Sequence, residues 1–164
     1  MSTLRVDNLR GQTADGTNRY VVQVVTTHKT DRFTTTSTSY TDITGATATI
    51  TPKSSNNKVL VTVNAHLGNN AANNGTHVIL LRDGTEIGSG TGAGSYNMFL
   101  GLIAQSTSHV SGCSNSFLDS PNTTNAVTYK LQMKASNGTA SLGGRGDSTA
   151  VQMPTAITLM EIAQ

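Results

Sequence analysis

Residues 58–67, KVLVTVNAHL, decide the fold class. Their apolar side chains alternate, with Val59, Val61, Val63, Ala65 and Leu67 on one face of an extended chain. The even positions between Leu60 and His66 fall on the other face and are mostly polar. A period of two indicates a strand with one buried face and one face near solvent.

The same pattern extends outward along the chain. Residues 127–135, VTYKLQMKA, repeat the alternation, and residues 20–29 and 46–52 read as further strands. Residues 156–163, AITLMEIA, are apolar on both faces except at Glu161, so we expect a strand that needs cover on both sides. Turn sequences such as NNAANNG, DSPNTTN and GGRGDS separate about ten short strands, with no convincing amphipathic helix. This arrangement predicts an all-β protein, a β-sandwich or jelly roll.

Composition narrows the class of partner. Charged residues make up 12% of the chain and the net charge is +2, without a cluster of lysines or arginines, so we expect no nucleic-acid partner. No apolar run is long enough for a membrane span, and the N-terminus lacks the apolar region of a signal peptide. The single Cys113 excludes an internal disulfide and any zinc site with two thiolates, and we expect it to pack as a small apolar residue.

The glycine-rich stretch at residues 77–94, HVILLRDGTEIGSGTGAG, resembles a phosphate-binding loop at first sight. Its glycines alternate at positions 88, 90, 92 and 94, and the following SYNMFLGLIAQ is strand-like rather than helical. A dinucleotide loop requires a helix after the glycines, and a P-loop requires a lysine there. Asp83-Gly84 is instead a strong signal for a two-residue hairpin turn.

No other pattern predicts catalysis or metal binding. The four histidines have no metal-ligand spacing, the carboxylates are dispersed, and no nucleophile elbow occurs. Arg145-Gly146-Asp147 matches an adhesion tripeptide, but three common residues in a glycine-rich loop arise easily by chance. We therefore expect no catalytic residue, no metal and no cofactor, and interpret the chain as a non-enzyme.

Several segments carry a resemblance to a known family. SYTDITG, ITPKSSNNK, LLRDGT, LDSPNTTNAVTYK and the closing ITLMEIA are similar to small virion structural proteins of tailed phages, notably phages of aquatic bacteria and cyanobacteria. The resemblance covers nearly the whole chain. It implies a jelly roll of the complement/tumour-necrosis-factor type that forms homotrimers, used as capsid decorations or as heads of tail fibres.

Two parts of the chain are expected to make contacts in such an assembly. Residues 20–164 would form the jelly roll, and a trimer interface is expected at Tyr20, Val22, Val24, Ile157, Leu159 and Ile162 because a doubly apolar strand has area to hide. Residues 1–19 would form an extended arm of at most about 65 Å. The apolar points and one cation of this arm are the expected grip on the major capsid protein: Leu4, Arg5, Val6 and Leu9.

The first hypothesis is thus a cement protein on the exterior of a phage capsid, a structural protein without chemistry. The alternative is the receptor-binding head of a tail fibre, with host surface glycan as its partner and the loops at residues 69–76, 88–95 or 143–149 as its binding surface. A glycan-cleaving enzyme is the third reading, disfavoured because no carboxylate pair is recognisable.

Overall fold

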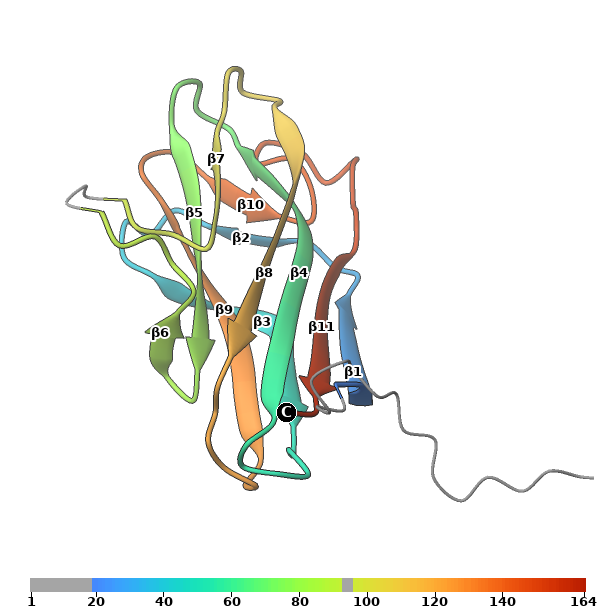
Figure 1. Cartoon of the computed structure of the whole chain (residues 1–164). Helices are drawn as coiled ribbons and strands as arrows, with labels where there is room; N and C mark the ends of the chain where they lie inside the picture. Colours follow the sequence, from blue (N-terminus) through green and yellow to red (C-terminus); the bar gives the residue numbers. More distant parts are fainter. Residues whose placement is uncertain (1–18, 93–95) are drawn as a thin grey trace, which may run out of the picture.

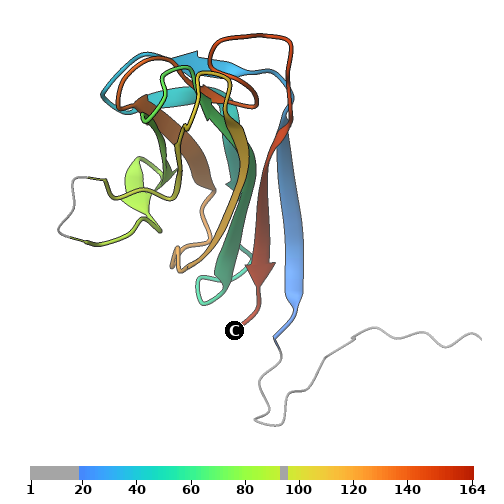
Figure 2. The same ribbon diagram turned by 90° about the horizontal axis from the view of Figure 1, so that it is seen from above.

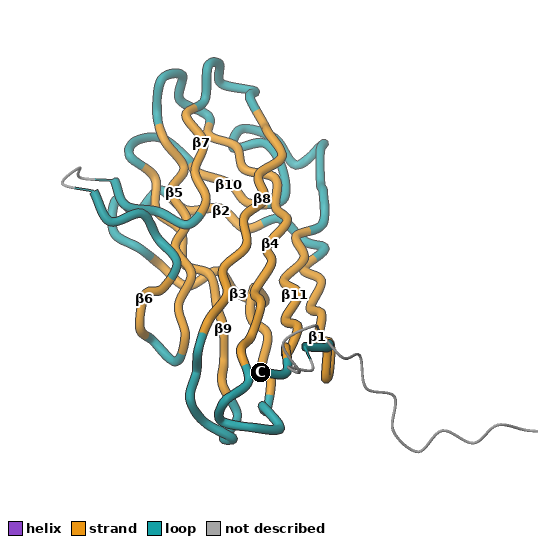
Figure 3. The backbone as a smooth tube through the Cα atoms, viewed as in Figure 1, coloured by secondary structure: helices purple, strands orange, loops and turns teal. Residues whose placement is uncertain are grey.

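The protein is all-β, with two antiparallel sheets packed face to face (Figure 1). The computed structural model describes residues 19–92 and 96–164, and within these ranges all regular elements are strands (Figure 3). Within the same ranges no helix is long and apolar enough to cross a membrane. The β-sandwich predicted from the alternating segments is confirmed.

One sheet, called sheet A here, places four long strands side by side (Figure 2). In spatial order they are β1 (Val21–Lys29), β11 (Thr155–Ile162), β4 (Lys58–Asn69) and β8 (Val110–Asp119). Two short strands extend the sheet from the end of β4, namely β10 (Ala140–Leu142) and β2 (Phe33–Thr35).

The opposing sheet, sheet B, is built around β5. Its order is β3 (Thr41–Ile50), β9 (Val127–Ala135) and β5 (Gly75–Arg82), and the far side of β5 pairs with β6 (Thr85–Ile87) and with β7 (Leu100–Ile103). The expected strands at residues 58–67 and 127–135 are therefore present in the two facing sheets.

The core lies between the alternating faces of β4 and β9. The odd positions of β4 from Val59 to Leu67 are at most 2% exposed, and those of β9 from Val127 to Ala135 at most 1%. Full burial of one such apolar side chain contributes about 1.5–3 kcal/mol before the entropy of ordering is subtracted. The residues that alternate as apolar in the sequence are thus the ones buried in the core.

The structure corrects one part of the expectation for β11: burial alternates along the strand instead of covering both of its faces. Ile157 and Leu159 lie in the core, 1% and 0% exposed, and Glu161 shares their inward face with no exposure. The outward face carries the even positions, including Met160 and Ile162, which are half-buried. The strand is edged on one side by β1 and on the other by β4, so the core covers one face only.

The Asp83-Gly84 turn joins β5 to β6 as the sequence predicted. Arg82 pairs with Thr85 across it, and both turn residues have positive φ, 47° for Asp83 and 89° for Gly84. This conformation defines a type I′ turn, whose twist matches that of the flanking strands. No helix follows the glycines within the described residues, so the phosphate-loop reading has no structural support.

We expect Gly84→Ala to lower the free energy of unfolding by about 1 kcal/mol, because an L side chain at positive φ is strained although it meets no atom. Urea denaturation measures the change. Gly90→Ala is the matched control, since that position is also open but does not have positive φ. Equal losses in the two variants would contradict the turn assignment.

Candidate functional site

The outward face of sheet A carries a continuous apolar row that crosses four strands. Val24 of β1 pairs with Met160 of β11, Met160 with Leu60 of β4, and Leu60 with Leu118 of β8. Val24 is 54% exposed and Leu118 48% exposed, while the two central side chains are half-buried. We call these four residues the apolar row; its two outer members expose apolar surface to solvent, as an interaction surface does.

A hydroxyl row lies directly beside the apolar row. Thr26, Thr158, Thr62 and Ser116 are in register across the same four strands. The hydroxyl oxygens of Thr62 and Ser116 are 3.1 Å apart, and those of Thr26 and Thr158 are 3.4 Å apart. Neither row contains a charged residue, so this part of the face can approach another surface without burying an ion.

Some of the residues predicted for a trimer interface lie on the outward side of sheet A, and others lie in the core. Tyr20 is 49% exposed, Val24 belongs to the apolar row, and Ile162 is on the same outward face of β11 as Met160. Val22 is half-buried at the register shift of β1. Ile157 and Leu159 point into the sandwich core, so the expectation that they face a partner is corrected: a partner could reach them only by opening the sandwich.

The predicted arm contacts Leu4, Arg5, Val6 and Leu9 lie outside the described residues and remain predictions.

Leu60, Met160 and Leu118 are interface candidates that the sequence analysis missed. Each was visible as an apolar residue at an even or outward position of a strand. The sequence does not show the pairing register of the four strands, and this register places residues as distant as Val24 and Leu118 in one row.

Glu161 is the first of two buried carboxylates and is fully satisfied. Its Oε1 accepts hydrogen bonds from the Lys53 amide at 2.7 Å and from Asn57 Nδ2 at 2.6 Å, and its Oε2 accepts one from Gln23 Nε2 at 2.6 Å. Burial acts to raise the pKa of Glu161, but the hydrogen bonds to Asn57, Gln23 and the backbone outweigh it and hold that pKa below its ordinary value. The carboxylate therefore ties β11 to β1 and to the β3–β4 turn.

Asp119 is the second buried carboxylate and connects the two sheets. Both of its oxygens accept from Arg82 Nη1, at 2.8 and 3.0 Å, and its Oδ2 also accepts from the Tyr129 hydroxyl at 2.7 Å. Burial first, and then the hydrogen bond to Asp119, raise the pKa of Tyr129 well above its ordinary range. Tyr129 thus stays protonated and acts as a structural donor between β9 and β8.

These carboxylates do not form a hydrolytic pair. Asp119 and Glu161 flank the buried Val59 on neighbouring strands, which places them roughly two strand spacings, about 10 Å, apart with a core side chain between them. Neither lines the sheet B pocket described below or two further hollows in the described part of the chain. Their lone pairs are occupied by protein donors, which suits structural locking rather than acid–base work.

The arginine and aspartate of the adhesion-like tripeptide form an ion pair with each other. Arg145 Nε and Nη2 donate to the two carboxylate oxygens of Asp147 at 2.9 and 2.7 Å, and Arg32 donates to the carbonyls of Arg145 and Ser148. Gly146 has no room for a side chain, because a Cβ there would lie 2.4 Å from the Thr139 carbonyl oxygen. The contacts of the motif therefore stabilise the conformation of the loop that contains it.

Metal and thiol chemistry find no support in the described residues. Within them, no group of three or more histidine, cysteine or acidic side chains converges as a metal site would require. Cys113 packs half-buried against the core, as expected from its sequence context, and burial raises the pKa of its thiol. The thiol is consequently protonated and unreactive at neutral pH.

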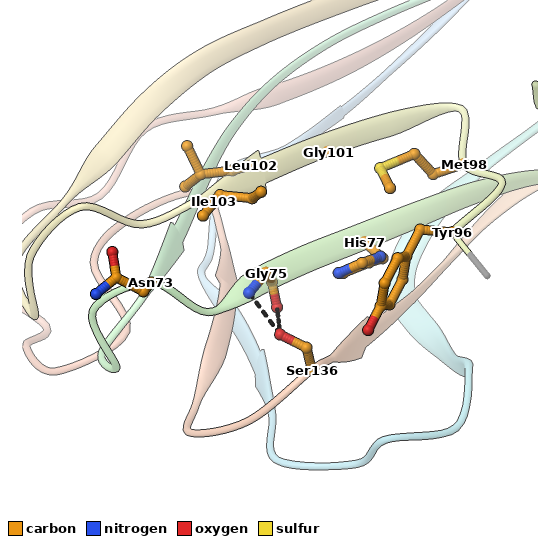
Figure 4. Close-up of a pocket in the computed structure, with 9 residues that line it drawn as sticks. All are labelled: Asn73, Gly75, His77, Tyr96, Met98, Gly101, Leu102, Ile103 and Ser136. Carbon is orange, nitrogen blue, oxygen red and sulfur yellow. Dashed lines mark hydrogen bonds between the residues drawn. The ribbon is translucent and has the colours of Figure 1, made fainter. Parts of the chain in front are cut away.

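A pocket of about 480 Å³ opens on the outward side of sheet B, opposite the apolar row (Figure 4). Asn73 and Gly75 reach it from the predicted loop at residues 69–76, and Tyr96 and Met98 from the segment before β7. His77 of β5 lies at its base and is 5% exposed. The glycines at residues 88–92 line a separate shallow hollow, and residues 143–149 line neither space.

Comparisons with known proteins leave the function to be argued from this geometry. The chain matches no protein-family model and no curated protein. The function is argued below from two features, the apolar row of sheet A and the pocket of sheet B.

Proposed function

We propose that the chain is a non-enzymatic structural protein of a phage virion, a homotrimeric jelly roll that decorates the capsid exterior and stabilises the head by bridging capsid subunits. The apolar row carries this proposal. It is uncharged and has no partner among the described residues, and a trimer closed around a threefold axis would bury it by packing this face of each chain against its neighbouring copies. The sequence resemblance to trimeric virion proteins supports a threefold arrangement.

The jelly-roll assignment is supported by how the chain pairs with itself. The first long strand pairs with the last, β1 with β11, and the successive inner pairs are β3 with β9, β4 with β8 and β5 with β7. The pairs alternate between sheet A and sheet B. A long antiparallel ribbon wrapped over itself gives this order, which is the way a jelly roll arises.

The position of the chain's entry point supports a gripping arm. The Tyr20 carbonyl accepts a hydrogen bond from the Ala163 amide at 3.0 Å, so the sandwich begins beside its last strand and beside Ile162. In a trimer built on the apolar row, three such entry points would lie near one end of the assembly. Arms starting there would reach neighbouring capsid subunits together, with Leu4, Arg5, Val6 and Leu9 as their contacts.

The alternative function, a tail-fibre head that recognises host glycan, is favoured by a different observation, the pocket on sheet B. The two functions use opposite faces of the sandwich, so evidence for one does not count against the geometry of the other.

A symmetric electron-microscopy reconstruction of the virion that carries the protein tests the proposal. Trimers at icosahedral positions on the capsid, with the N-terminal residues ordered against the shell, are the expected result. Density restricted to the tail in a few copies would overturn the decoration role, and a monomeric mass in sedimentation equilibrium would overturn the trimer.

A further inference from the structure

Two glycines on paired strands leave room at the floor of the sheet B pocket for larger side chains to fold over the sheet. Gly101 of β7 lies opposite His77 of β5, and Gly75 lies two residues before His77 on the same outward face. A Cβ at Gly75 would lie 2.1 Å from His77 Nε2, and a Cβ at Gly101 would lie 2.0 Å from Met98 Sδ. The space is therefore occupied by an imidazole and a thioether that fold down over the sheet.

His77 contributes a buried ring nitrogen without a partner. Its Nδ1 is shielded from solvent and makes no hydrogen bond among the described residues, which is costly unless a ligand or water supplies one. Burial, and after it the nearby charge of Lys134, lower the pKa of the His77 imidazole. The ring is neutral at pH 7 and offers one donor and one acceptor.

Tyr96 supplies an exposed aromatic wall. The residue is 59% exposed, and its ring centroid is 4.7 Å from that of His77, with the planes tilted by 47°. Lys134 Nζ lies 5.9 Å from the Tyr96 centroid but closer to Tyr40, at 4.6 Å, and is not part of the lining. An exposed ring beside polar groups gives a ligand one apolar surface on which to stack.

The remaining polar groups of the lining are neutral. Ser136 Oγ accepts a hydrogen bond from the Gly75 amide at 2.5 Å and holds the mouth of the pocket in place, and Asn73 adds a carboxamide at its far end (Figure 4). None of the described residues that line the pocket is charged at neutral pH. A ligand matched to this lining is uncharged, rich in hydroxyl groups and apolar on one face.

We propose that this pocket binds a neutral saccharide of one or two pyranose rings, with the C–H face of a sugar stacked on Tyr96 and its hydroxyls bonded to His77 and Asn73. A volume of about 480 Å³ is in the range of small-molecule sites and suits a ligand of this size. The inference does not depend on the capsid location or on trimerisation, because the pocket and the apolar row are on opposite sheets.

Titration of the labelled full-length protein tests the site. The probes are the methyl glycosides of glucose, galactose, mannose and N-acetylglucosamine, added to tens of millimolar and followed in ¹H–¹⁵N spectra. We expect at least one probe to cause saturable shifts centred on the amides of Gly75, His77 and Gly101. Tyr96→Ala, at an exposed side chain, is expected to weaken that binding roughly tenfold.

Tyr20→Ala is the matched control, because Tyr20 is a similarly exposed tyrosine next to β1 of the opposite sheet, and it should leave saccharide binding unchanged. A second variant, Gly75→Ala, should abolish binding by displacing the His77 ring. The proposal is overturned if no neutral probe shifts the three amides, if Tyr96→Ala and Tyr20→Ala bind alike, or if glucuronic acid binds where the neutral glycosides do not.

Discussion

Glu161→Leu is expected to lower the free energy of unfolding at pH 7 by about 4 kcal/mol, because it removes a charged acceptor from one buried donor and one part-buried donor. The Lys53 amide and Asn57 Nδ2 both lose the oxygen they share, whereas Gln23 Nε2 keeps its second acceptor, the Thr51 carbonyl at 2.7 Å. Urea denaturation measures the loss. Glu86→Leu, the same substitution at an exposed position of β6, is the control and should change stability little.

The same residue predicts a response to acid. The pKa of Glu161 in the folded protein is below its ordinary value of 4.5, so its contribution to stability is complete above that value and is lost as pH falls through the folded pKa. Exposed acids such as Asp31 and Asp42, whose pKa values are also lowered, add their own acid dependence. The difference in melting temperature between wild type and Glu161→Gln isolates the buried group. That difference should shrink from pH 6 to pH 3, and a constant difference would rule out the linkage.

Local pattern was sufficient to predict the strands and turns. The alternation of β4 and β9 and the Asp83-Gly84 signal depend on interactions within a few residues, and the structure confirms all three. The parity of β11 was also present in the sequence: Glu161 is in step with Ile157 and Leu159, which indicates a charge on the core side. The prediction treated Glu161 only as an exception on an otherwise apolar strand, because the donors that satisfy it come from distant residues such as Gln23.

Features that depend on pairing between distant segments could not be read from the sequence. The apolar row requires the registers of three strand pairs, and the pocket requires the β5–β7 pairing that places Gly101 opposite His77. Likewise, the Arg145–Asp147 fork distinguishes a self-bound loop from an open adhesion motif only once the loop is folded. Sequence spacing fixes which face of a strand a residue occupies, whereas function on a sheet depends on which strands are adjacent.

Leu118→Glu is expected to convert the proposed trimer to monomers without unfolding the chain. Leu118 is 48% exposed at the outward end of the apolar row, so a glutamate there is well solvated in the isolated sandwich. In an assembly closed on this face, each copy would bury one unpaired carboxylate, at a cost of several kcal/mol per ion. Burying three glutamates costs more free energy than the apolar contacts of the trimer interface contribute, so the equilibrium shifts from trimer to monomer.

Thr49→Glu is the matched control, because it places the same charge at an exposed strand position on the outward face of sheet B. Sedimentation equilibrium should give the mass of three copies for wild type and for Thr49→Glu, and of one copy for Leu118→Glu, with urea unfolding transitions that show all three chains folded. A Leu118→Glu protein that remains trimeric would place the interface elsewhere. Among the described residues the edge strand β1 has no hydrogen-bonded neighbour on one side, so we would then expect the contact to be made strand to strand at that edge rather than face to face.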